Sequence, residues 1–260
     1  VWKAYYENGQ LKEEVNYTNN KKNGVWSVYY ENGQLKESYF VLNKTRSGEH
    51  KAYYENGQLR MSGSYNEDGR ESGEWRYYHD NGQLKEIGNY SGIGNPIGEW
   101  KIYHSNGNLN SIGNYMNDYD TYYGHDNINR PDFSLVDRFP SYKDGEWKIY
   151  HENGKLKEVG NYSDNSEIGE WKEYDIDGNI TNTREYLNGR PFKGRFKFEF
   201  YLDGYLIENY IEGKKTGESK MYSKNGKLEA IGNYINDKKV GEWKYYDKNG
   251  ELIETENFEN

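Results

Sequence analysis

A short phrase recurs along the whole chain and limits what the chain can fold into. Its centre is a glycine preceded by Asn or Asp and followed, two residues later, by Leu or Ile. Ten copies occur, spaced by 22 to 26 residues except for one interval of 47. Self-similarity at such a period indicates a tandem repeat array. The turn glycines are Gly9, Gly33, Gly57, Gly82, Gly107, Gly154, Gly178, Gly204, Gly226 and Gly250.

Each copy of the phrase predicts one β-hairpin. Asn-Gly or Asp-Gly between apolar residues is the strongest short hairpin signal, because a two-residue type I′ turn requires positive φ at both positions. A single hairpin is marginal in water, so the repeats are expected to pair edge to edge. We predict an all-β, elongated array of about ten antiparallel β-hairpins that forms one continuous twisted meander sheet.

Aromatic residues supply most of the apolar surface. Hydrophobic residues make up 33% of the chain, and 29 Tyr and 7 Trp are among them; each such ring can bury roughly 150–250 Å². All seven tryptophans stand seven residues before a turn glycine. Three repeats have another residue in that place, namely His50, Lys197 and Ser219.

The spacing also predicts which residues face each other. With a two-residue loop, Trp75 lies opposite Gly88, so a large indole is expected to cover a residue without a side chain. By the same register, Gly73 lies opposite Tyr90. The tryptophan, the aliphatic residue after the turn and the second tyrosine are predicted to share one face. The constant tyrosine four residues before the turn glycine is predicted to point to the other face.

The charge balance narrows the classes of partner. With 34 basic and 43 acidic residues the net charge is −9, which disfavours nucleic acid and anionic membranes. The absence of cysteine excludes a disulfide framework and a thiol nucleophile. The sequence has no apolar run of the ~20 residues that a membrane-spanning helix needs. It starts at Val1 like a trimmed chain, so the compartment stays open between the cytoplasm and export with a leader removed.

The interval of 47 residues divides the array. We expect five hairpins in residues 1–115, an insertion or decayed repeat in 116–144 and five hairpins in 145–260, all within one continuous solenoid-like domain. The excess length is close to one repeat, which favours a repeat that lost its turn. The alternative is a binding loop, because functional groups concentrate in loops on rigid scaffolds. Its binding candidates are Tyr122, Tyr123, His125, Arg130, Asp132 and Phe133.

A second set of binding candidates lies three residues before the turn glycine. The residue in this place varies between repeats, as a specificity position would. The candidates are Tyr30, Tyr54, His79, His104 and His151. The three histidines do not predict a metal site, since equivalent positions in successive hairpins lie ~10 Å apart and zinc ligands lie ~2.0–2.1 Å from the ion. We expect neither a metal nor a cofactor.

No motif for catalysis is present. The sequence lacks a Ser-His-Asp spacing, a P-loop, a dinucleotide fingerprint and a His-Glu-x-x-His motif. A protein that is not an enzyme is therefore expected.

Two phrases resemble a known family. Trp-Lys-x-Tyr-Tyr-x-Asn-Gly-x-Leu, found with substitutions at residues 26–35, 75–84 and 243–252, and Gly-Asn-Tyr, found at 88–90, are similar to the variant class of MORN repeats. These hairpins occur in tandem in many bacterial proteins, including families labelled antitoxin or immunity proteins. The resemblance implies an elongated all-β array that binds other proteins, sometimes membranes, and has no active site of its own.

Three hypotheses for function follow. The leading one is a non-catalytic repeat scaffold that binds another protein; in its most specific form, an antitoxin or immunity protein covers a basic toxin that the acidic surface attracts. The alternative is a surface module that binds glycan or cell wall, suggested by the periodic Tyr and Trp. The third, a lipid-binding scaffold, is disfavoured by the net charge.

Overall fold

The computed structural model describes residues 1–18, 21–42, 44–117, 141–200 and 204–259. These residues form two compact units, Val1–Lys155 and Leu156–Asn260. The first unit contains β1 (Trp2–Tyr5), β2 (Leu11–Thr18), β3 (Lys21–Tyr29), β4 (Leu35–Leu42), β5 (Thr45–Tyr53), β6 (Leu59–Tyr65), β7 (Glu71–Tyr78), β8 (Leu84–Tyr90), β9 (Pro96–Tyr103), β10 (Leu109–Asn117) and β11 (Ser141–Tyr150). The second contains β12 (Leu156–Ser163), β13 (Ser166–Tyr174), β14 (Ile180–Leu187), β15 (Arg190–Phe200), β16 (Gly204–Ile211), β17 (Lys214–Lys215), β18 (Gly217–Tyr222), β19 (Leu228–Ile235), β20 (Lys238–Tyr246) and β21 (Leu252–Phe258).

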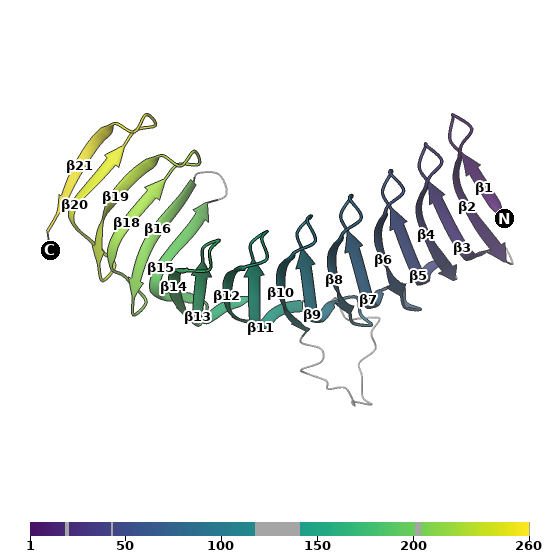
Figure 1. Ribbon diagram of the computed structural model, residues 1–260, viewed down its shortest axis with the longest axis horizontal. Helices are drawn as coiled ribbons and strands as arrows, with labels where there is room; N and C mark the ends of the chain where they lie inside the picture. Colours follow the sequence, from purple (N-terminus) through teal and green to yellow (C-terminus); the bar gives the residue numbers. More distant parts are fainter. Residues whose placement is uncertain (19–20, 43, 118–140, 201–203, 260) are drawn as a thin grey trace, which may run out of the picture. The chain divides into compact units, whose positions relative to one another are not determined.

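The architecture is all-β, and the described residues contain no helix. The strands belong to one open antiparallel sheet of 21 strands. Within each unit, consecutive strands are neighbours, as a meander of hairpins requires (Figure 1), except that the short β17 and the following β18 both pair with β16. The predicted fold class, an array of tandem antiparallel hairpins, is confirmed. The predicted segment boundaries at residues 115 and 145 stay a prediction.

The hairpin loops differ from the predicted two-residue type I′ turns. In the first repeat, the amide of Tyr6 donates to the carbonyl of Gln10 over 2.8 Å, and the amide of Gly9 donates to the carbonyl of Tyr6 over 3.0 Å. Gly9 has a φ of 84°, whereas Asn8 is not among the residues with positive φ. The loop therefore has three residues and combines a type I turn with a left-handed glycine. The predicted turn type is wrong.

A β-bulge in the following strand restores the predicted register. Ala4 pairs with Glu13 but Tyr5 pairs with Leu11, so Lys12 is an extra residue in β2. The loop and the bulge each shift the pairing by one, and the two shifts cancel. As a result, Trp75 pairs with Gly88 and Gly73 with Tyr90, as predicted.

The bulge changes the face of the sheet on which the aliphatic residue after the turn lies. The aliphatic residue after the turn pairs directly with the constant tyrosine, as Leu11 does with Tyr5 and Leu84 with Tyr78. Directly opposed residues share a face. The aliphatic residues therefore lie on the face of the constant tyrosine, and the prediction that they share the tryptophan face is wrong.

Two-residue turns with positive φ do occur, but at the opposite ends of the hairpins. Asp164 and Asn165 have φ values of 50° and 64°, and the strands on either side of them pair Ser163 with Ser166. Asn236 and Asp237 close the β19–β20 connection in the same way. Two-residue turns with positive φ thus occur at connections between repeats, although the β6–β7 and β8–β9 connections have the three-residue form with Gly69 and Gly94 at positive φ.

Much of the core consists of indoles packed on glycines, and each of these indoles covers a glycine of the preceding hairpin. A Cβ added to Gly88 would lie 2.1 Å from Cδ2 of Trp100, not against its own partner Trp75. Gly63 is covered by Trp75 in the same way. The prediction that the opposed indole covers the glycine is therefore corrected, because the packing joins neighbouring repeats. The same arrangement recurs for Gly113 with Trp147, Gly160 with Trp171 and Gly232 with Trp243.

In two places where a larger residue replaces the glycine, the residue in the tryptophan position of the next hairpin is smaller than tryptophan. Tyr39 is followed by His50, which is 0% exposed and packs edge-on against it at 5.6 Å. Buried Glu208 is followed by buried Ser219 in the same way. In both pairs the side chain in the glycine position occupies space that the indole fills elsewhere, so the interior stays packed.

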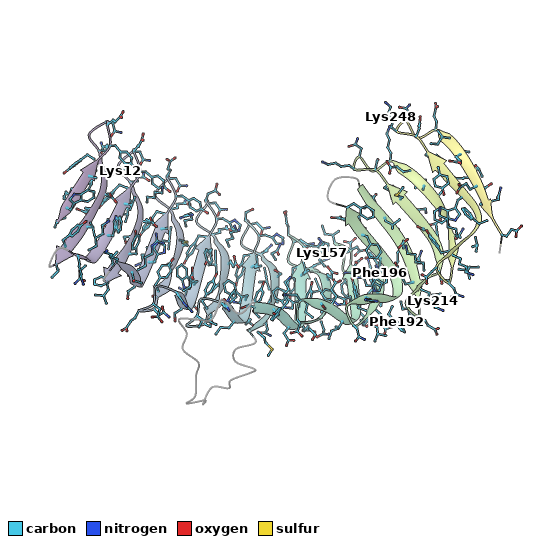
Figure 2. All side chains as sticks on the ribbon, turned by 180° about the vertical axis from the view of Figure 1, so that it is seen from behind. Lys12, Lys157, Phe192, Phe196, Lys214 and Lys248 are labelled. Carbon is cyan, nitrogen blue, oxygen red and sulfur yellow. The ribbon has the colours of Figure 1, made fainter. Side chains whose placement is uncertain are left out.

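The β15–β16 hairpin departs most from the repeat. Its ladder pairs Phe200 with Gly204 without a bulge, and Lys197 lies opposite Ile207. Phe196, labelled in Figure 2, is buried next to Tyr186 at 5.2 Å. The expectation that Lys197 takes the tryptophan position is thus wrong, because the shifted register gives that position to Phe196.

Candidate binding surface at the hairpin loops

The three-residue loops that contain the Asn-Gly phrase form a row along one edge of the first unit (Figure 1). We call this row the loop edge; it consists of residues 7–9, 31–33, 55–57, 80–82, 105–107 and 152–154. Each loop repeats the geometry of the first, with the turn glycine at positive φ. Successive loops are two strands apart, about 10 Å along the sheet. The loop edge therefore presents the same groups at a fixed interval.

The predicted specificity positions join each hairpin to the next. The hydroxyl of Tyr30 donates to the carbonyl of Tyr53 over 2.8 Å, and that of Tyr54 donates to the carbonyl of Tyr78 over 2.7 Å. These side chains are half-buried at the base of the loops. They hold neighbouring hairpins at a fixed spacing, while their predicted role in binding stays a prediction.

The histidines in this position make the same contact. Nε2 of His79 lies 3.0 Å from the carbonyl oxygen of Tyr103, and Nε2 of His104 lies 3.1 Å from that of Tyr150. A carbonyl oxygen only accepts, so these nitrogens carry the proton. His151 occupies the equivalent place in the last loop of the row. Within the described ranges, no three His, Cys, Asp or Glu side chains come together in a way that could hold a metal ion.

A row of asparagines runs parallel to these contacts. Nδ2 of Asn32 donates to the carbonyl of Glu55 over 3.1 Å, and its Oδ1 accepts from the amide of Gln34 over 2.9 Å. Asn56 makes the same two contacts: its Nδ2 donates to the carbonyl of Asp80 in the next repeat, and its Oδ1 accepts from the amide of Gln58 in its own loop. Each asparagine thus closes its own loop and bonds to the following one. The Asn of the sequence phrase is needed for these two bonds instead of for a type I′ turn.

The loop edge carries exposed charge of both signs. Glu31, Glu55 and Asp80 are exposed, and their carboxylates make no ion pair within the described residues. Basic side chains follow at the bulges, including Lys12 and Lys36, each of whose Nζ atoms lies 5.5 Å from the ring centre of a loop tyrosine. Figure 2 labels Lys12 among the side chains at this edge. The rigid backbone therefore holds exposed carboxylates ~10 Å apart, with cations beside them.

The candidates of the long interval lie outside the described residues. Tyr122, Tyr123, His125, Arg130, Asp132 and Phe133 all fall within residues 118–140. The strands on either side pair directly, Asn117 with Ser141 and Met116 with Tyr142. The array thus continues from β10 to β11 without an intervening strand.

A concave pocket on the tryptophan-bearing face was missed by the sequence analysis. It has a volume of about 440 Å³ and lies at the connections between repeats, away from the loop edge. Its basic side chains come from two successive connections: Lys21, Lys22, Lys44 and Arg46. Its remaining lining is apolar or aromatic: Tyr17, Trp26, Tyr39 and Val41. The signal in the sequence is a cation four residues before the tryptophan position in two adjacent repeats, Lys22 before Trp26 and Arg46 before His50.

A cluster of polar side chains lies beside this pocket: His50 is buried, whereas Glu37 and Arg46 are partly exposed. Nε2 of His50 lies 3.3 Å from Oε2 of Glu37, and the guanidinium of Arg46 lies 4.0 Å from the same oxygen. The hydrogen bond with His50, together with the charge of Arg46, lowers the pKa of Glu37 below its ordinary value. Glu37 therefore stays ionised at neutral pH and belongs to the packing around His50.

One family of proteins matches this chain by sequence. The model described as MORN repeat variant matches residues 1–19, 22–43, 46–67, 71–91, 96–117, 143–164, 215–236 and 239–260. Residues 165–214, where Arg184, Phe196 and Glu208 replace the glycine and the tryptophan, are not matched. A comparison with curated proteins gave no match.

Three solved structures are similar at a low level. The crystal structure of TcdB2-TccC3-TEV is 10% identical with a TM-score of 0.21, covering 98% of this chain and 16% of that one. The crystal structure of TcdB2-TccC3-Cdc42 is 14% identical with a TM-score of 0.18, covering 95% and 14%. A structure of the Photorhabdus luminescens Tc holotoxin pore is 12% identical with a TM-score of 0.19, covering 96% and 15%. This chain thus spans less than one fifth of their length, and such similarity carries no functional argument.

Proposed function

The chain belongs to the MORN repeat variant family, and on that premise we propose that it is a non-catalytic scaffold that binds another protein along the loop edge. In the most specific form of this proposal, it is an antitoxin or immunity protein that neutralises a basic toxin by covering it. Within the described residues, no helix is long and apolar enough to cross a membrane.

The observation that carries the proposal is the fixed row of free carboxylates. Glu31, Glu55 and Asp80 are exposed on loops whose backbones are bonded to one another through Asn32 and Asn56. A preorganised backbone loses little entropy when the loops bind a partner, which favours affinity. A surface of this kind suits a partner with basic groups at a matching interval.

The charge of the whole chain supports a basic partner. The net charge is −9, and complementary charge raises the rate of encounter more than it raises affinity. Association at the loop edge should therefore be fast at low salt and should slow as the salt concentration rises. An acidic scaffold that captures a basic protein quickly would serve to neutralise it.

The test combines capture with charge reversal. The purified chain is used to capture proteins from native lysate at low salt, and the captured proteins are identified by mass spectrometry. The loop variant Glu31→Lys/Glu55→Lys/Asp80→Lys should lose the captured partner. A control with the same change of charge, Glu49→Lys/Glu99→Lys/Glu146→Lys, alters exposed carboxylates within strands and should keep it. Recovery of no stoichiometric protein, or equal capture by both variants, would refute the proposal.

The glycan-binding alternative has less support. Glycans bind aromatic side chains whose ring faces are open, but Trp75, Trp100 and Trp147 are only 1–3% exposed. Their faces pack on the glycines of the preceding repeats. A glycan array separates the two functions: we expect no retained glycan, and a specific retained glycan would favour the alternative.

A further inference from the structure

We propose that the pocket lined by Lys21, Lys22, Lys44 and Arg46 is a separate binding site for an acidic peptide segment of another protein. This site lies at the connections between repeats, so it goes beyond the loop edge and its basic partner. Among the described residues that line the pocket, none is acidic. Four cations in one concavity on a chain with a net charge of −9 form a local positive potential that attracts anions.

At the same repeat position in the second unit, Lys215 and Lys239 have closer polar partners than Lys22 and Arg46 have in the pocket. Lys215, four residues before Ser219, lies 2.7 Å from Glu208. Lys239, four residues before Trp243, lies 2.8 Å from the hydroxyl of Tyr245, which donates to Glu256 over 2.9 Å. In the pocket, Lys22 makes no ion pair within the described residues, and the nearest carboxylate to Arg46 is 4.0 Å away.

The two central cations rest on aromatic rings. Nζ of Lys22 lies 3.3 Å from the ring centre of Trp26, and the guanidinium carbon of Arg46 lies 4.3 Å from that of Tyr39. The two rings are themselves in contact, with centres 5.6 Å apart. Cation–π contacts fix the position of a charge. Arg46 also interacts with Glu37 and with the hydroxyls of Tyr39 and Tyr65, but a guanidinium has five N–H donors, so some of them remain for a ligand. Lys22 and Arg46 can therefore donate hydrogen bonds to an incoming anion.

The arrangement favours carboxylates over sugars. Because the cations cover the ring faces of Trp26 and Tyr39, these faces are not open for stacking. A carboxylate needs no ring face and pairs with Lys and with the fork of Arg through charge-assisted hydrogen bonds. Two acidic side chains of one segment can engage the cations of the two connections at once.

The size and openness of the pocket favour a peptide. A volume of about 440 Å³ falls within the usual range for ligand pockets, roughly 300–1,000 Å³. Tyr17 at its rim is 44% exposed, and Lys21 is exposed as well. A chain that places two or three residues in the pocket can therefore continue out of it across this rim.

The proposal is tested with an array of hexapeptides that carry two Asp or Glu residues and varied neighbours, each printed beside its Asn or Gln counterpart. The folded chain should retain a subset of the acidic peptides and none of their amide counterparts. The variant Lys22→Gln/Arg46→Gln should bind the selected peptides at least about tenfold more weakly, as the loss of charge-assisted bonds implies. The control Lys143→Gln/Lys239→Gln removes cations that also lie over indoles, 4.4 Å from Trp147 and Trp243, and should keep full binding.

Three outcomes would overturn the proposal. The first is that the array shows no preference for acidic peptides over their amide counterparts. The second is that the pocket variant and the control bind the selected peptides equally well, with circular dichroism showing both to be folded. The third is that vesicles containing phosphatidylserine bind through Lys22 and Arg46 while no peptide does, which would assign the pocket to a membrane. Loss of the loop-edge partner leaves all three results unchanged, so the two proposals fail separately.

Discussion

The packing of indoles on glycines predicts that one added methyl group destabilises the array. In Gly63→Ala, the new Cβ would lie 2.1 Å from Cδ2 and 2.4 Å from Cε2 of Trp75. Trp75 is 1% exposed, and its indole N–H donates to the carbonyl of Ser64 over 3.3 Å. The indole therefore cannot make room without leaving its site and losing that bond.

The size of the effect follows from three contributions. Overpacking a core costs about 1–3 kcal/mol, and the lost hydrogen bond costs about 1 kcal/mol. Replacing glycine by alanine stabilises by about 0.4–1 kcal/mol through the unfolded chain where the backbone permits it, and Gly63 does not have a positive φ. We expect a net destabilisation of about 1–3 kcal/mol from these terms.

The matched control is Gly92→Ala. Gly92 also lacks a positive φ, and the nearest atom to an added Cβ is Nδ2 of Asn66 at 4.0 Å. This variant should be neutral or slightly stabilised. Urea denaturation followed by circular dichroism compares the two midpoints. The reasoning is refuted if Gly63→Ala unfolds at the same urea concentration as Gly92→Ala, or if Gly63→Ala/Trp75→Phe recovers none of the loss.

The remaining predictions concern ionised groups and the contacts between repeats. Burial raises the pKa of Glu86. The ionised carboxylate therefore lowers the free energy of unfolding above that pKa, and this destabilisation is absent at low pH. Glu86→Gln should raise the melting temperature at pH 7 but not at about pH 3. The lowered pKa of Glu37 contributes stability that is lost in acid, so Glu37→Gln should lower the melting temperature at pH 7 and have a smaller effect at about pH 3; the same sign for both variants at pH 7 would contradict this. Tyr54→Phe removes the bond to the carbonyl of Tyr78 and should cost about 1 kcal/mol in urea denaturation, while an unchanged midpoint would show that the bond contributes nothing.

The repeat period and the pairing of tryptophan with glycine could be predicted from sequence, but the turn could not. Two hairpin geometries place Trp2 opposite the same residue, Val15. One has a three-residue loop and a bulge at Lys12, and the other has a two-residue loop and no bulge. The spacing of side chains is identical in the two cases, so the sequence pattern alone does not separate them. The side-chain bonds of Asn8, which accepts from Gln10 and donates to Glu31, identify the three-residue loop.

For a related reason, the sequence could not predict which tryptophan covers each glycine. Every strand of a meander has two neighbours, and a uniform period places a tryptophan near each glycine from both sides. Only the three-dimensional packing shows that Trp100, and not Trp75, fills the space above Gly88. The pocket depends on two cations, Lys22 and Arg46, from different repeats, and their significance emerges only when the repeats lie side by side.

The dependence of each indole on the hairpin before it restricts how such a gene can gain or lose copies. Hairpins with tryptophan in the first strand and the covered glycine in the second strand are interchangeable. Unequal recombination among them therefore preserves the tryptophan-glycine contact between neighbouring hairpins. An in-frame deletion of the hairpin from His50 to Gly63 would instead bring Tyr39 against Trp75, two large rings where the sheet has space for one. Tyr39 and His50 are therefore expected to be inherited together, as are Glu208 and Ser219, while the glycine-tryptophan copies between them vary freely in number.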